Sequence, residues 1–154
     1  MALVGIVVGS KSDMEFIQPA LDTLTELGIE YGFSVISAHR TPESVREYGL
    51  EAEKRGFKVI IAAAGYAAHL PGVVASWTTL PVVGVPLPTS ELKGVDALLS
   101  ITQMPGGVPV ACTGMGRSGA KNAALLAAQI LGVQYEEIRE NYRRYKQRLA
   151  EGQI

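Results

Sequence analysis

The sequence predicts an α/β fold, a three-layer sandwich built on a doubly wound parallel sheet. Short aliphatic runs alternate with helical patterns along almost the whole chain. The runs are continuously apolar, as expected of parallel strands that are buried on both faces. The length of 154 residues and the apolar content of 47% suit one domain, 1–154, with a sizeable core.

Five strands are expected to alternate with five helices. The strands are predicted at Leu3–Val8, Tyr31–Ile36, Val59–Ala63, Val82–Val85 and Val108–Cys112. The helices are predicted at Met14–Leu27, Pro42–Arg55, Pro71–Thr78, Val95–Gln103 and Ala120–Leu131. Right-handed crossovers between such units favour a flavodoxin-like sheet of strand order 2-1-3-4-5.

Capping and turn residues mark the ends of the first two helices. Asp13 is the predicted N-cap of the first helix. Thr41 is the predicted N-cap of the second, which places Pro42 at the first helical position, where its missing N–H costs nothing. Gly28 and Gly56 are placed to end these two helices.

The C-terminal segment 135–151 follows the α/β core of residues 1–131 and predicts an amphipathic helix. Its apolar residues recur at three- and four-residue spacing: Tyr135, Ile138, Tyr142, Tyr145 and Leu149. Two interpretations stay open for this stripe, namely packing on its own domain and packing on a neighbouring subunit.

Composition excludes several classes of function. The net charge of −1 gives no electrostatic reason to expect nucleic acid or an anionic membrane as a partner. No signal-peptide pattern or long apolar run is present, and the single Cys112 suits a reducing compartment, so we expect a soluble cytoplasmic protein. Two separated histidines and one cysteine make no metal-ligand cluster, so no metal is expected.

Both histidines of the chain follow predicted strands. In a doubly wound sheet, ligands bind outside the carboxyl ends of the strands. Five segments are therefore expected to share one rim: 9–13, 37–42, 64–70, 86–92 and 113–119. His39 and His69 fall on this rim, and imidazole is the side chain best suited to proton transfer near neutral pH. We expect proton-transfer chemistry on a small anionic molecule, the alternative being two ordinary loop histidines.

Two rim segments carry groups suited to a phosphorylated sugar. Ser10 and Ser12 precede a helix, where hydroxyls and free amides favour an anion, and Asp13 is able to accept hydrogen bonds from ribose hydroxyls. In the second segment Arg40 supplies a cation with forked donors and Ser37 another hydroxyl. Each residue also has a purely structural interpretation, as a cap or a surface side chain.

Two further segments carry weaker indications. The segment 62–70 is uncharged apart from His69 and predicts either a dry pocket wall or a tightly packed turn. The segment 114–119 matches G-x-G-x-x-G but lies on the last predicted strand, with no later strand to supply a ribose-binding acid. A close-packed or anion-binding turn is favoured over a nicotinamide site, and no cofactor is expected. Cys112 is expected to be a packed residue rather than a nucleophile.

Several long motifs together resemble the PurE family, the carboxyaminoimidazole ribonucleotide mutases and carboxylases of purine biosynthesis. The similar segments are Gly9–Asp13, Ser37–Pro42, Ala67–Gly72, Leu80–Pro86, Leu98–Ile101 with Gln103–Pro105, and Asn122–Ala127. They occur in order over residues 4 to 131. The resemblance implies a flavodoxin-like subunit in a homo-octamer, whose sites form where subunits meet and need no metal or cofactor.

The resemblance also implies roles for individual residues. Ser10, Ser12, Asp13, Ser37 and Arg40 would hold the ribose 5-phosphate of a ribonucleotide. His39 would be the catalytic acid and base, and the pocket for the base and the carboxyl group would include Gly65, His69 and Leu70. The implied reaction moves a carboxylate from the exocyclic nitrogen to the ring carbon of aminoimidazole ribonucleotide.

Two parts of the chain depart from the family pattern, and one of them is the segment Cys112–Met115. Ala63 and Tyr66 stand where the family usually has glycine, and a tyrosine adds bulk beside His69. Two alternatives stay open. One is direct carboxylation of aminoimidazole ribonucleotide by carbon dioxide, the reaction of the family's other branch. The other is a non-catalytic nucleotide-binding module, which Tyr66 suggests.

Overall fold

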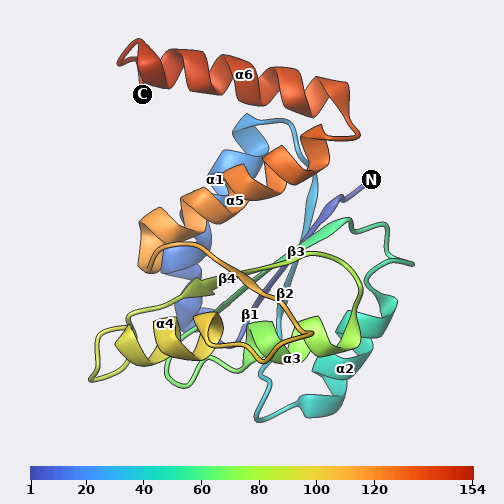
Figure 1. The fold of residues 1–154 in the computed structure, drawn as a ribbon, viewed down its shortest axis with the longest axis vertical. Helices are drawn as coiled ribbons and strands as arrows, with labels where there is room; N and C mark the ends of the chain where they lie inside the picture. The colour runs from blue at the N-terminus through green and yellow to red at the C-terminus, as the bar shows by residue number, and fades with distance from the viewer.

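A computed structural model describes all residues 1–154 and contains a five-stranded parallel sheet of order β2-β1-β3-β4-β5, which confirms the predicted topology (Figure 1). The strands are β1 (Val4–Val8), β2 (Tyr31–Val35), β3 (Val59–Ala64), β4 (Val82–Pro86) and β5 (Ala111–Cys112). The α-helices are α1 (Met14–Glu26), α2 (Pro42–Glu51), α3 (Leu70–Trp77), α4 (Val95–Thr102), α5 (Gly116–Gly132) and α6 (Glu136–Ala150). A short 3-10 helix, η1 (Lys11–Asp13), lies between β1 and α1.

The central strands are buried on both faces, as their continuously apolar sequences predict. Alternate side chains of β3 enter different cores: Ile61 packs in a cluster of 23 buried residues with α1 and α5, and Ile60 in a cluster of 14 with α2, α3 and α4. The three layers are visible in Figure 1. This arrangement holds the carboxyl ends of β1, β2 and β3 side by side.

The last strand and the last core helix differ from prediction. β5 has two residues instead of the predicted five, Val108–Cys112. Pro109 lacks the N–H that a ladder needs, and β5 pairs with β4 alone, so pairing is confined to Ala111 and Cys112. Helix α5 begins at Gly116, not Ala120, because the glycine-rich segment forms its first turn.

The C-terminal helix packs on its own subunit. Ile138 and Tyr145 are buried in the cluster that contains α1 and α5, and the Asn141 side-chain amide donates a hydrogen bond to the Leu27 carbonyl at 2.9 Å. Figure 1 shows α6 lying across the outer side of α1 and α5, away from the sheet. No helix combines the length and hydropathy that a bilayer crossing requires.

Candidate active site

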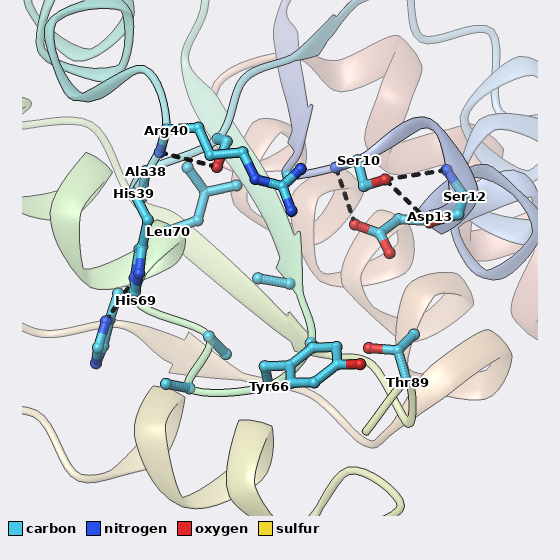
Figure 2. A pocket seen from close by; sticks show the side chains of 16 residues that line it. Ser10, Ser12, Asp13, Ala38, His39, Arg40, Tyr66, His69, Leu70 and Thr89 are labelled. Carbon is cyan, nitrogen blue, oxygen red and sulfur yellow. Dashed lines mark hydrogen bonds between the residues drawn. The ribbon is translucent and has the colours of Figure 1, made fainter. Parts of the chain in front are cut away.

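A cavity of about 560 Å³ opens at the carboxyl ends of β1, β2 and β3 (Figure 2). All nine residues predicted for the site line it: Ser10, Ser12, Asp13, Ser37, His39, Arg40, Gly65, His69 and Leu70. They come from three loops that are separated by long stretches of sequence. The parallel topology alone brings them together.

The loop after β1 is held by its own polar side chains. The Ser12 amide donates to Ser10 Oγ at 3.3 Å, and the Ser10 amide donates to Asp13 Oδ2 at 3.1 Å. Asp13 holds the predicted N-cap position of α1, but its side chain makes no capping hydrogen bond to that helix. Because η1 precedes α1, Ser10 becomes the N-cap of the turn and Asp13 closes a capping box with it.

Asp13 is an unusually buried carboxyl group for a pocket wall. The residue is 6% exposed, and burial raises the pKa of its carboxyl above the ordinary value, although hydrogen bonds from the backbone of Ser10 and Gly9 lower it. Its side chain faces the cavity (Figure 2). Lone pairs that Ser10 does not use are available to a ligand hydroxyl.

The loop after β2 is a turn fastened at Ser37. The Arg40 amide donates to Ser37 Oγ at 3.2 Å, and the Thr41 hydroxyl donates to the Ser37 carbonyl at 2.9 Å. Thr41 holds the predicted N-cap position of α2 but makes no side-chain capping bond, and Pro42 occupies the first turn as predicted. The guanidinium of Arg40 extends across the cavity toward Ser10 (Figure 2). The site thus presents a cation beside two serine hydroxyls.

The two histidines contact each other directly. His69 Nδ1 lies 2.7 Å from His39 Nε2, and the rings are 4.8 Å apart with an interplanar angle of 13°. One of the two nitrogens must donate and the other accept, so at least one imidazole is neutral while this hydrogen bond exists. The tautomers of the two rings decide which nitrogen donates, and the contact fixes the rings against each other at the edge of the cavity.

The loop after β3 forms the remaining wall. A side chain at Gly65 would meet Thr89 Oγ1 at 1.8 Å from its Cβ, so only glycine lets the loops after β3 and β4 approach. Leu70, the first residue of α3, is 2% exposed and joins the wall to the core. Tyr66 adopts a left-handed conformation with φ 54°.

Sequence reasoning missed Thr89 as a pocket residue. The segment 86–92 was expected on the rim, but nothing local distinguishes Thr89 from its neighbours. The segment 113–119 was expected on the same rim and does not line the cavity. It packs tightly instead: a Cβ on Gly119 would lie 1.5 Å from the Gly114 carbonyl oxygen.

Two other chemistry-bearing groups lie outside the cavity. The Arg117 guanidinium donates to the carbonyl of Glu15 on α1. Burial raises the pKa of the Cys112 thiol, which disfavours the nucleophilic thiolate. No three His, Cys, Asp or Glu side chains gather as ligands for a metal ion.

Comparison with known proteins agrees with this architecture. The N5-carboxyaminoimidazole ribonucleotide mutase of Saccharolobus solfataricus is 54% identical over 147 residues, covering 96% of this chain and 92% of the relative. The Bacillus subtilis protein of the same name is 58% identical over 136 residues, covering 88% of this chain and 84% of the relative. The crystal structure of Treponema denticola PurE matches with a TM-score of 0.88 at 32% identity, covering 99% of this chain and 94% of that one.

The sequence profile of one family spans nearly the whole chain. It is described as AIR carboxylase and matches residues 3–152, which include every residue of the cavity. The chain therefore belongs to the AIR carboxylase family.

Proposed function

We propose that this protein is an N5-carboxyaminoimidazole ribonucleotide mutase, an isomerase that forms 4-carboxyaminoimidazole ribonucleotide in purine biosynthesis. The observation that carries the proposal is the polarity of the cavity, which has a cation and hydroxyls at one end and a hydrogen-bonded histidine pair at the other. Relatives at 54% identity or more carry the mutase name. A phosphorylated sugar with a proton-accepting base spans such a cavity.

The phosphate and the ribose are assigned to the end formed by the loops after β1 and β2. Arg40 binds phosphate oxygens through its forked donors, and the hydroxyls of Ser10, Ser12 and Ser37 add neutral donors. Asp13 accepts hydrogen bonds from the ribose hydroxyls. This end fixes the ribonucleotide and leaves its base directed at the histidines.

The base and the migrating carboxyl group are assigned to the other end. His39 is the acid and base, and His69 holds the ring of His39 through the 2.7 Å contact between them. Gly65 lets Thr89 approach and close the wall beside the base, and Leu70 contributes an apolar surface. This uncharged wall, continued by Ala64, Ala67 and Ala68, suits a neutral carbon dioxide molecule.

The reaction then proceeds in three balanced steps. Protonated His39 donates its proton to the carbamate nitrogen, the C–N bond breaks, and carbon dioxide and aminoimidazole ribonucleotide remain in the cavity. The ring carbon attacks carbon dioxide with the electron pair of the enamine, forming the C–C bond. Neutral His39 removes the proton from that carbon, which restores aromaticity and returns His39 to its protonated form.

Retention of both fragments explains why the protein needs no further reactant. Holding carbon dioxide beside the ring carbon avoids the entropy cost of a second encounter. His39 gives one proton to the carbamate nitrogen and takes another from the ring carbon, so its protonation state is restored, and no electron is gained or lost overall. The proposed chemistry requires no metal, nucleoside triphosphate or redox cofactor.

A spectrophotometric assay tests the proposal. Freshly prepared N5-carboxyaminoimidazole ribonucleotide and its 4-carboxy isomer are each incubated with the protein, and parallel samples contain aminoimidazole ribonucleotide and bicarbonate. Rapid interconversion of the two isomers is the expected result. Turnover only in the bicarbonate samples would instead assign direct carboxylation, and nucleotide binding without any turnover would leave a binding module.

We also propose that residues 1–154 act as one domain in a cytoplasmic homo-octamer. Exposed apolar side chains support assembly: Leu92 is 62% exposed, Val95 51% and Leu99 54%, and all three follow the pocket residue Thr89. The unpaired Cys112 suits a reducing compartment. Light scattering coupled to size-exclusion chromatography tests the assembly, and a monomeric mass would contradict it.

A further inference from the structure

Tyr66 occupies a backbone conformation that is unfavourable for its side chain. Its φ is 54°, in the left-handed region that favours glycine, and φ at Ala68 in the same loop is 37°. The turn is closed by a hydrogen bond of 2.9 Å from the Ala68 amide to the Gly65 carbonyl. Strain of this kind persists where the surroundings or a ligand compensate for it.

The side chain of Tyr66 gains little from its own subunit. The residue is 64% exposed, whereas Tyr48 is 4% and Tyr145 3% exposed. No hydrogen bond joins Tyr66 to another residue of the cavity (Figure 2). The ring therefore adds no core packing in the free protein.

The ring is placed to cover a ligand. Figure 2 shows it between the histidine pair and Thr89, across the cavity from Arg40 and Ser10, with its hydroxyl directed toward Thr89. A ribonucleotide whose phosphate lies at Arg40 presents its base on the side of the cavity that Tyr66 borders. An aromatic face is suited to stack on a flat heteroaromatic ring.

We infer that Tyr66 is a substrate-contact residue that selects for the base, its ring stacking on the five-membered ring of the ribonucleotide. This inference rests on the proposed function for the identity of the base. The phosphate and the ribose are held by other loops, so Tyr66 governs recognition of the base alone.

Equilibrium binding distinguishes recognition of the base by Tyr66 from recognition of the phosphate and the ribose. Calorimetry on the full-length protein would compare 4-carboxyaminoimidazole ribonucleotide with ribose 5-phosphate, which lacks the base, for wild type, Tyr66→Gly and Tyr66→Phe. We expect Tyr66→Gly to lose about tenfold in affinity for the ribonucleotide, the size of one stacking contact, and nothing for ribose 5-phosphate. Tyr66→Phe keeps the ring and should bind both ligands like wild type.

A melting curve for each variant excludes a merely structural role. Tyr66→Gly removes the strained side chain and should melt no lower than wild type. Equal affinity of Tyr66→Gly and wild type for the ribonucleotide would overturn the inference. Equal loss for both ligands, or loss in Tyr66→Phe as large as in Tyr66→Gly, would also overturn it.

The binding experiment tests the role of Tyr66 whether or not the protein catalyses the isomerisation. A wild type that binds the ribonucleotide more tightly than ribose 5-phosphate, with the excess lost in Tyr66→Gly, supports the inference even if the isomerase assay is negative. A wild type that binds both ligands equally overturns it even if that assay is positive.

Discussion

The sheet core and the strand-end cavity differ in the kind of side chains that form them. In the core beneath α1 and α5, strands and helices contribute aliphatic side chains that are almost wholly buried, such as Ile6, Ile61 and Leu24 at 0% exposure. The cavity instead gathers a buried carboxyl at Asp13, a cation at Arg40 and a strained tyrosine at Tyr66. Substitutions of exposed cavity side chains should therefore spare folding, and substitutions of core side chains should lower stability, whereas the buried Asp13 belongs to both regions.

The largest expected effect is on the cavity side. His39→Asn removes the acid and base and should lower kcat about 100- to 10,000-fold. The side chain is exposed, so the melting temperature should stay near that of wild type. Steady-state kinetics and a melting curve measured on the same preparation check both expectations. Turnover close to that of wild type would remove His39 from its assigned role.

The corresponding change in the core should act in the opposite way. Ile61→Ala leaves a cavity at a fully buried position of β3 and should lower the free energy of unfolding by about 2–5 kcal/mol. The matched control is Val133→Ala at a residue that is 79% exposed, where a change within about 0.5 kcal/mol is expected. Urea titration measures both. Equal losses of stability in the two variants would show that burial of Ile61 in the core does not determine its contribution to stability.

Arg40 should affect binding rather than folding. Loss of its charge-assisted hydrogen bonds in Arg40→Met should raise KM about 10- to 100-fold. Arg40→Lys keeps the charge but not the fork, so an intermediate KM is expected. An initial-rate series in the isomerase assay distinguishes the three proteins. A KM unchanged in Arg40→Met would show that the phosphate lies elsewhere.

The buried Asp13 makes a prediction about pH. Its folded-state pKa is raised above the ordinary value of 3.8, so the folded protein holds this proton more tightly than the unfolded chain does. The resulting stabilisation is present below that value and is lost as the pH rises through the folded pKa. Asp13→Asn does not titrate and keeps an acceptor for the Ser10 amide.

Urea unfolding at pH 4 and at pH 7 tests this sign. Relative to Asp13→Asn, wild type should be less stable at pH 7 than at pH 4. A difference between the two proteins that is independent of pH would show that the carboxyl is solvated as in the unfolded chain. The variant should also bind the ribonucleotide more weakly, because an acceptor of the ribose hydroxyls has lost its charge.

The smallest expected effect concerns the one polar atom that the core leaves without a partner. Tyr48 is 4% exposed and its hydroxyl has no hydrogen-bond partner. Tyr48→Phe should therefore be neutral or raise the free energy of unfolding by up to about 1 kcal/mol. Thermal and urea unfolding measure the change. A clear loss of stability would reveal a hydrogen bond to the hydroxyl.

Local sequence predicted the centre of the fold well and its last strand poorly. The aliphatic runs of β1, β3 and β4 are continuous because both faces are buried, so composition alone identifies them. The run at 108–112 looks similar, but Pro109 and a position at the edge of the sheet shorten the strand to two residues. Edge pairing depends on neighbours that a local pattern does not contain.

The cavity was predictable as a place but not in its contacts. Strand ends of a parallel sheet converge, which placed Ser10, Ser37 and His39 on one rim. The contact between His39 and His69 joins residues 30 positions apart, and the capping role of Asp13 depends on a 3-10 turn between β1 and α1. Thr89 enters the cavity only because Gly65 has no side chain.

An isotope experiment decides whether the strand-end cavity moves a carboxylate within one bound ribonucleotide. N5-carboxyaminoimidazole ribonucleotide labelled with 13C in its carboxylate would be converted in a single turnover in the presence of unlabelled bicarbonate. Most of the 4-carboxy product should keep the label, because carbon dioxide is held beside the ring carbon. A product whose carboxylate has lost the 13C label to the unlabelled bicarbonate would contradict retention of carbon dioxide in the cavity.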